Sequence, residues 1–293
     1  DRMRSAMGYN VRKNWVESFT LMVTRPIVIL PFIIVAFLEG IALELVYFSP
    51  RRPISYLVNP LVKKFFGEGF VHYPGSLLLL PKLFYYAQVA IYLLVGALLA
   101  AITVAMVRNL RMGLPLKANA LIKNALKRYT SFLTYALVLV ALMFLVKKVE
   151  VYVFVRVFRK LAIHLPQIIV EMSPFMLALL LFLSSIILQV FLLLVIPIIV
   201  MEKKMILKAF WGSIVLGFRN FLSIFALISV PFMIYLPIVL LRTGSDKIIA
   251  KTFPEVNILI AAASTIVTVF VECFIMICGS HFLLDKEGTK VKK

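Results

Sequence analysis

The chain has 293 residues, of which 62% are hydrophobic and only 15% are charged. Soluble domains hold about 45–50% apolar and about 25% charged residues, so this composition excludes an ordinary soluble protein and indicates that lipid covers much of the apolar surface. The formal net charge of +19 would suggest nucleic-acid binding in a soluble protein. Here the basic residues lie mostly between apolar stretches, where they set topology and meet anionic head groups. We expect no nucleic-acid partner and predict a single integral membrane domain over residues 1–293.

Six apolar runs are long enough to cross about 30 Å of hydrocarbon, because about 20 helical residues at 1.5 Å each cover that distance. In chain order they are Pro26–Phe48, Leu83–Val107, Ser131–Val146, Phe175–Val200, Phe221–Leu241 and Val256–Leu284. The third run is the shortest and has room to continue beyond Lys147 and Lys148. These runs predict an all-α polytopic membrane protein with about six transmembrane helices.

Short basic segments lead into three of these runs, at Val11–Arg25, Leu114–Arg128 and Lys203–Arg219. Each separates an apolar face from a basic face at helical spacing, and helices of this kind lie in the head-group plane. In the first segment, Trp15, Phe19 and Met22 are expected to share the apolar face. We predict three amphipathic interfacial helices, with lipid head-group contacts from Arg12, Lys13, Trp15, Arg25, Lys117, Lys123, Lys127, Arg128, Lys203, Lys204, Lys208, Trp211 and Arg219.

A loose threefold internal repeat follows when each basic segment is grouped with the spans after it. The pseudo-repeat units are 11–107, 114–200 and 203–284. Each contains a surface helix, a span, a connection on the far side and a second span, and internal repeats of this kind are common in membrane proteins. The register is loose, since the second unit has no counterpart of Trp15 or Trp211.

The distribution of lysine and arginine predicts which side of the membrane holds the termini. The segments on the side of the N-terminus hold the larger share of the 32 basic residues, and residues 108–128 contain no acid. Because cytoplasmic segments carry the excess of positive charge, both termini are predicted to be cytoplasmic. The expected location is the cytoplasmic, or inner, membrane of a bacterium or archaeon.

Two connections on the far side have patterns of their own. Residues 49–82 contain several prolines and predict a loop with a short interfacial helix around 57–66. Residues 147–174 alternate valines like a strand, although Arg156, Arg159, Lys160 and His164 also fall on one helical face. Because a lone strand has no partner, we favour a helix that either extends the third span outward or lies on the outer surface.

Four polar residues inside the apolar runs are the intramembrane candidates: Glu39, Gln88, Gln189 and Glu272. Polar groups in a span are costly, so they mark either a path for protons, cations or substrate, or hydrogen bonds between helices. Glu39 and Glu272 are expected at somewhat different depths. Enzyme motifs are absent and the three histidines are scattered in sequence, so we expect no catalytic residues, no metal site and no cofactor.

One stretch resembles a known group of membrane proteins. It comprises the motifs PIIVMEK from Pro197, KAFWGS from Lys208 and RNF from Arg219. The pattern is similar to poorly characterised six-span bacterial and archaeal families, including the membrane domain fused to some glycerophosphodiester phosphodiesterases. The resemblance covers residues 197–221, implies no catalytic or binding residues, and does not extend to the phosphodiesterase activity.

The sparse intramembrane chemistry and the abundant basic and aromatic surface favour one function. We predict a non-enzymatic multi-pass membrane subunit or scaffold that acts with anionic lipids or with other membrane proteins. The alternative is a transport permease, with a polar path through the helix bundle and a cytoplasmic ATPase as its partner.

Overall fold

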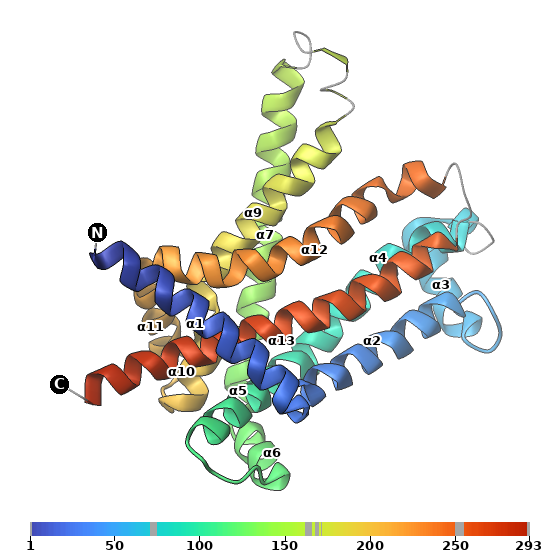
Figure 1. Cartoon of the computed structure of the whole chain (residues 1–293). Coiled ribbons are helices and arrows are strands. Elements are labelled where there is room, and N and C mark those ends of the chain that lie inside the picture. The colour runs from blue at the N-terminus through green and yellow to red at the C-terminus, as the bar shows by residue number, and fades with distance from the viewer. Residues whose placement is uncertain are drawn as a thin grey trace.

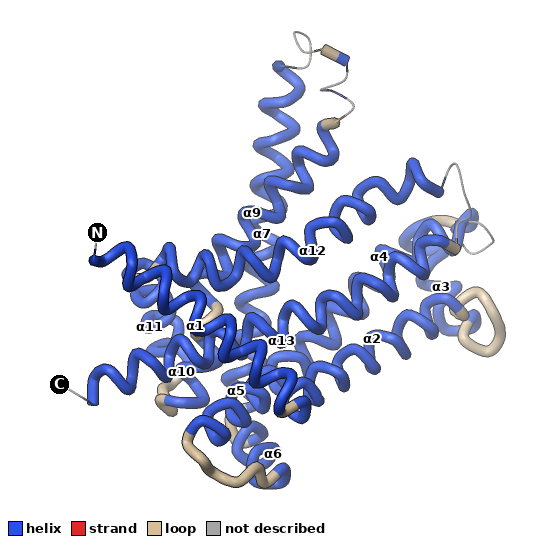
Figure 2. The backbone as a smooth tube through the Cα atoms, in the orientation of Figure 1, coloured by secondary structure: helices blue, strands red, loops and turns tan. Residues whose placement is uncertain are grey.

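The computed structural model describes residues 2–70, 75–161, 166–167, 170, 172–249 and 255–291. Every regular element within these residues is helical (Figure 2). Six helical segments in this part of the chain are long and apolar enough to span a membrane: Pro26–Tyr47, Ser76–Arg111, Tyr129–Phe158, Ser173–Met201, Phe221–Leu241 and Val256–Lys286. The predicted all-α polytopic fold is therefore confirmed.

The first third of the chain holds two spans. Helix α1 (Arg2–Thr24) ends just before Arg25 and is followed by the 3-10 turn η1 (Pro26–Ile29) and by α2 (Leu30–Tyr47). The predicted short helix after this span is α3 (Ser55–Phe66), which the 3-10 turn η2 (Glu68–Phe70) follows. The second span comprises α4 (Gly75–Ile91), a π-helical turn η3 (Tyr92–Gly96) and α5 (Ala97–Arg111).

The remaining spans begin with the other two basic segments. Helix α6 (Ala118–Leu126) precedes α7 (Tyr129–Leu161), and the fourth span comprises α9 (Ser173–Leu192) and the short α10 (Val195–Met201). Helix α11 (Ile206–Arg219) then leads into α12 (Phe221–Ile249), and α13 (Val256–Val291) completes the bundle. All three basic segments therefore fold as separate helices that end at or close to an arginine.

Helix α7 decides between the two alternatives for residues 147–174. It continues without a break through Leu161, so the extension of the third span is confirmed over that range. The alternating valines are thus helical residues, and they face several sides of one helix. His164 lies outside the described residues.

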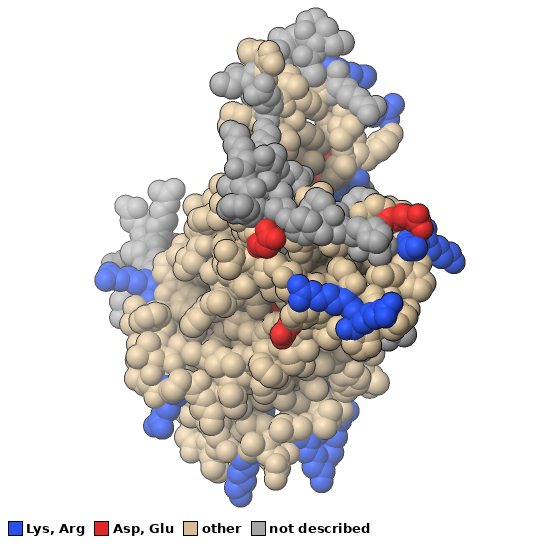
Figure 3. All heavy atoms as spheres, turned by 90° about the vertical axis from the view of Figure 1, so that its right-hand side faces the viewer, with Lys and Arg blue, Asp and Glu red and all other residues tan. Residues whose placement is uncertain are grey.

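The spans are arranged around α13, which packs against α12, α2, α5, α1 and α4. In Figure 1, α2, α4, α12 and α13 run toward the right of the view, whereas the hairpin of α7 and α9 diverges from them and points upward. We call the part with α6, α11 and both termini the run-in end, and the opposite ends of the spans the far end. Figure 3 looks onto the far end of α2, α4, α12 and α13, where most of the described surface is uncharged.

The core of the run-in end is built around α10. Six of its seven residues are buried, and it packs against α5 and α11. The last carbonyls of a helix have no partner within the helix. One of them, the Ile199 carbonyl, accepts a hydrogen bond of 2.8 Å from Nη1 of Arg128. This arginine is therefore bound to the protein and anchors the start of α7 to the end of α10.

Helix α11 lies close against α9 and α10 because one of its faces is made of small residues. Ala209, Ser213 and Gly217 recur every four residues and are buried. Small residues at this spacing allow two helices to approach closely. The Ser213 hydroxyl donates a hydrogen bond of 2.6 Å to the Phe191 carbonyl of α9, which fixes the rotation of α11.

Replacing Gly217 by leucine should loosen this contact. A Cβ at position 217 would lie 3.1 Å from the Val190 carbonyl oxygen and 3.3 Å from the Phe191 Cα, so the backbone of α9 would have to move. Overpacking of this kind costs about 1–3 kcal/mol. We expect a lower thermal unfolding midpoint for Gly217→Leu in detergent. The matched control is Gly40→Leu, because a Cβ at Gly40 meets nothing within 4 Å; an equal loss in both variants would contradict the proposed packing.

Candidate functional site

Two of the four intramembrane candidates lie together. The side chain of Gln88, on α4, donates from Nε2 to Oε2 of Glu39, on α2, over 2.7 Å. The same oxygen accepts a second hydrogen bond of 3.2 Å from the Thr265 hydroxyl of α13. Three spans that are far apart in sequence therefore meet at one carboxylate.

The surroundings of this carboxylate explain why a membrane helix can carry it. Glu39 is 8% exposed and Thr265 is 6% exposed, and α2 packs against both α4 and α13. A buried carboxylate is tolerated when donors from neighbouring helices satisfy its oxygens. The arrangement joins three helices at one buried carboxylate.

Glu272 and Gln189 lie outside this hydrogen-bonded cluster. Glu272 follows Thr265 by seven residues on α13, about 10 Å along the helix axis. Gln189 is half-buried on α9. Sequence reasoning missed Thr265, because a threonine in an apolar run carries no signal until the packing of α13 against α2 is known.

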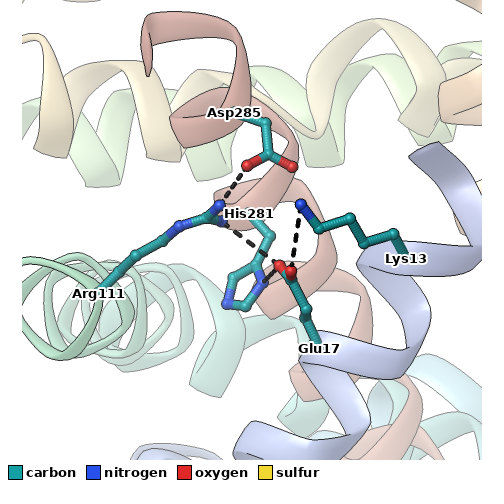
Figure 4. A network of polar contacts seen from close by, with 5 residues as sticks. All are labelled: Lys13, Glu17, Arg111, His281 and Asp285. Atoms are coloured by element: carbon teal, nitrogen blue, oxygen red, sulfur yellow. Dashed lines mark hydrogen bonds and ion pairs between the residues drawn. The ribbon is translucent and has the colours of Figure 1, made fainter. Parts of the chain in front are cut away.

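A second polar cluster lies at the run-in end (Figure 4). Glu17 of α1 approaches three groups: Nζ of Lys13 at 3.6 Å, Nη1 of Arg111 at 3.8 Å and Nδ1 of His281 at 3.4 Å. Arg111, at the end of α5, also pairs with Asp285 of α13. The network ties α1 to both α5 and α13. Its members come from three distant segments, so it could not be predicted from the sequence.

The orientation of α1 corrects one expectation. Trp15, Phe19 and Met22 fall on one side of α1 by helical spacing, but that side does not all face outward: Met22 is buried, Trp15 is half-buried and Phe19 is 64% exposed. The buried face of α1 is instead partly polar and includes Asn14 and Ser18. Glu17 approaches Arg111 and His281, and the outward face of α1 combines Val16, Phe19 and Val23 with Arg12 and Lys13.

Most of the residues predicted to contact head groups lie on the surface. Trp15 and Arg128 are half-buried, and Arg128 is bonded to the Ile199 carbonyl. The exposed ones are Arg12, Lys13, Arg25, Lys117, Lys123, Lys127, Lys203, Lys204, Lys208, Trp211 and Arg219. The structure thus leaves these cations and one tryptophan accessible to a bilayer surface, whereas their contact with lipid stays a prediction.

Removing the charge of Arg111 should loosen the attachment of α1. Its side chain is 32% exposed, and partly exposed ion pairs contribute at most about 1 kcal/mol each. For Arg111→Met we expect amide hydrogen exchange in α1 to rise by about fivefold, which corresponds to that energy. The control is Arg108→Met, one turn earlier on α5. If both variants speed exchange equally, the effect comes from α5 as a whole and the bridging role is wrong.

Comparison with protein-family models, with curated proteins and with solved structures yields no match to this chain. The resemblance of residues 197–221 to six-span membrane families therefore stays a prediction. The helical membrane architecture is shown by the six apolar helices. Any function has to be inferred from the surfaces and polar clusters described above.

Proposed function

We propose that this chain is a non-enzymatic membrane subunit or scaffold that acts at the bilayer surface through anionic lipid. The observation that carries the proposal is the outward face of α11. Leu207, Trp211 and Phe218 are 80%, 69% and 70% exposed, respectively. At 100° per residue these three side chains fall within about 40° of one another on the helix.

Basic side chains border this apolar row. Lys208 and Arg219 are exposed and lie on one flank of the apolar row. Lys203 and Lys204 come just before α11 in the chain. A helix with an apolar row beside a basic edge binds in the plane of the interface. Each lysine or arginine near an anionic surface adds about 1 kcal/mol of attraction, which favours anionic lipid over zwitterionic lipid.

The close packing of α11 on the protein supports the same interpretation. Its small-residue face packs closely on α9 and α10, and the Ser213 hydroxyl is bonded to the Phe191 carbonyl. The packed face therefore keeps Leu207, Trp211 and Phe218 on the outside of the protein. With the run-in end in the cytoplasm of a bacterium or archaeon, α11 would lie on the inner leaflet, and other membrane proteins could assemble on the surface that it anchors.

The two tryptophans allow a direct test of α11. In Trp15→Phe only Trp211 fluoresces, and in Trp211→Phe only Trp15 does. Trp211 is 69% exposed, whereas the Trp15 indole nitrogen is buried. In liposomes with brominated lipids we expect stronger quenching of Trp211 than of Trp15, and stronger quenching by brominated phosphatidylglycerol than by brominated phosphatidylcholine. Quenching of Trp211 that is weak with both lipids would overturn the proposal.

A transport permease is the second candidate, and the cluster at Glu39 favours it. An open groove of about 890 Å³ lies between α2 and α13 at the far end, and its lining includes Gly40, the neighbour of Glu39. Glu44 and Glu255 also line this groove. Acidic groups at a mouth above a buried carboxylate would draw in protons or other cations.

Liposome flux distinguishes the two candidates. Glu39→Gln keeps an oxygen that can accept from Gln88 and Thr265 but cannot ionise, and Glu44→Gln changes an exposed carboxyl in the groove. If the chain is a permease, liposomes with the wild-type protein should take up protons or monovalent cations. The Glu39→Gln variant should lose this flux, and the Glu44→Gln variant should retain most of it. Wild-type liposomes with no flux above empty liposomes would rule out this proton or cation path and leave the scaffold.

A further inference from the structure

Helix α7 is the least covered of the spans in the described part of the chain. Only 22% of its most apolar window is buried inside the protein, against 33–44% for the other five spans. The α7–α9 hairpin diverges from the remaining helices (Figure 1). One face of α7 is therefore only lightly covered over its far half, where the Tyr85 ring of α4 lies against Phe144.

That face is an open groove of about 780 Å³. Its lining follows one stripe of α7, with residues at intervals of three and four. Phe144 lies nearest the middle of the span, Lys147 and Lys148 come next, and Val151, Tyr152 and Arg156 continue toward the far tip. The apolar Phe144 thus lies next to the pair Lys147 and Lys148 along the groove.

The groove is electropositive. Its described lining contains three cations and no acid. The nearest acid on α7, Glu150, faces the other way and accepts a hydrogen bond of 3.0 Å from the Ser184 hydroxyl of α9. Lys147 lies 5.6 Å from the centre of the Tyr85 ring of α4, a contact that holds its ammonium at the groove without neutralising it.

The position of Lys147 and Lys148 along α7 indicates which part of a bilayer they would face. Lys147 follows Tyr129, the first residue of α7, by 18 residues, which is about 27 Å of helix. The hydrocarbon core is about 30 Å thick. For a span that starts at the run-in surface beside α6, this length would bring Lys147 and Lys148 to the head-group level of the opposite leaflet. Phe144, one turn below, is then at the level of acyl chains.

We propose that this groove binds an anionic phospholipid of the far leaflet. Lys147 and Lys148 would hold the phosphate, and an acyl chain would lie along Phe144. Arg156 follows Lys148 by eight residues, about 12 Å, so it marks the outer end of the site and does not share the same phosphate. The site lies at the other end of the spans from α11, and it does not depend on the proposed role of that helix.

Native mass spectrometry of the full chain in mixed micelles of phosphatidylglycerol and phosphatidylcholine tests this site. The variant is Lys147→Gln with Lys148→Gln, which keeps polar side chains of similar length. The control is Lys63→Gln with Lys64→Gln, a second basic pair on α3 at the far end that the groove does not include. We expect about thirtyfold weaker phosphatidylglycerol binding in the groove variant, from the loss of two lysines at about 1 kcal/mol each near the head group, and little change in the control.

Four outcomes would overturn the assignment. An equal loss in both double variants would mean that only total charge matters. An equal loss of phosphatidylcholine binding in the groove variant, with Trp211 quenching unchanged, would mean that the lysines do not select anionic lipid. Competition by millimolar inorganic phosphate would assign the lysines to a free anion. Efficient disulfide crosslinking between two copies of the Val151→Cys variant would mean that a second copy of the chain, and not a lipid, occupies the groove.

Discussion

Backbone hydrogen bonding in lipid constrains everything else in this molecule. A chain that crosses hydrocarbon must satisfy its own N–H and C=O groups, so irregular backbone is tolerated only where protein covers it. Three of the described spans depart from a continuous α-helix, at the 3-10 turn η1, at the π-helical turn η3 and at the break between α9 and α10. Gly96 of η3 and Leu193 and Leu194 at the break are buried. Arg128 supplies a donor to α10 from outside the span.

The six spans could be predicted because the length of an apolar run follows directly from the thickness of the bilayer. The three basic segments could be predicted because basic and apolar residues alternate in them at helical spacing. The rest depended on contacts between distant segments. Nothing in the run from Pro197 shows that α10 is enclosed by α5 and α11. The rotation of α1 could not be predicted either, because it depends on Glu17 meeting Arg111 and His281.

The candidate site shows the same division. Glu39 and Gln88 could be selected from the sequence because polar side chains in a span are costly, but their pairing required the packing of α2 against α4. Thr265 and the carboxylate network at the run-in end became visible only in three dimensions. The polar cluster at Glu39 is hydrogen-bonded between its own helices. In contrast, α11 and the far half of α7 leave apolar and basic surface uncovered, which favours a role at the surfaces of the protein.

Both polar clusters share α13, which runs from Val256 to Val291 without a proline. Thr265 contacts Glu39 near one end of the helix, and His281 contacts Glu17 sixteen residues later, about 24 Å away. An uninterrupted helix of this length moves as a stiff rod. Any rigid tilt of α13 therefore displaces both contacts together, and the two sides of the membrane are mechanically joined through a single element.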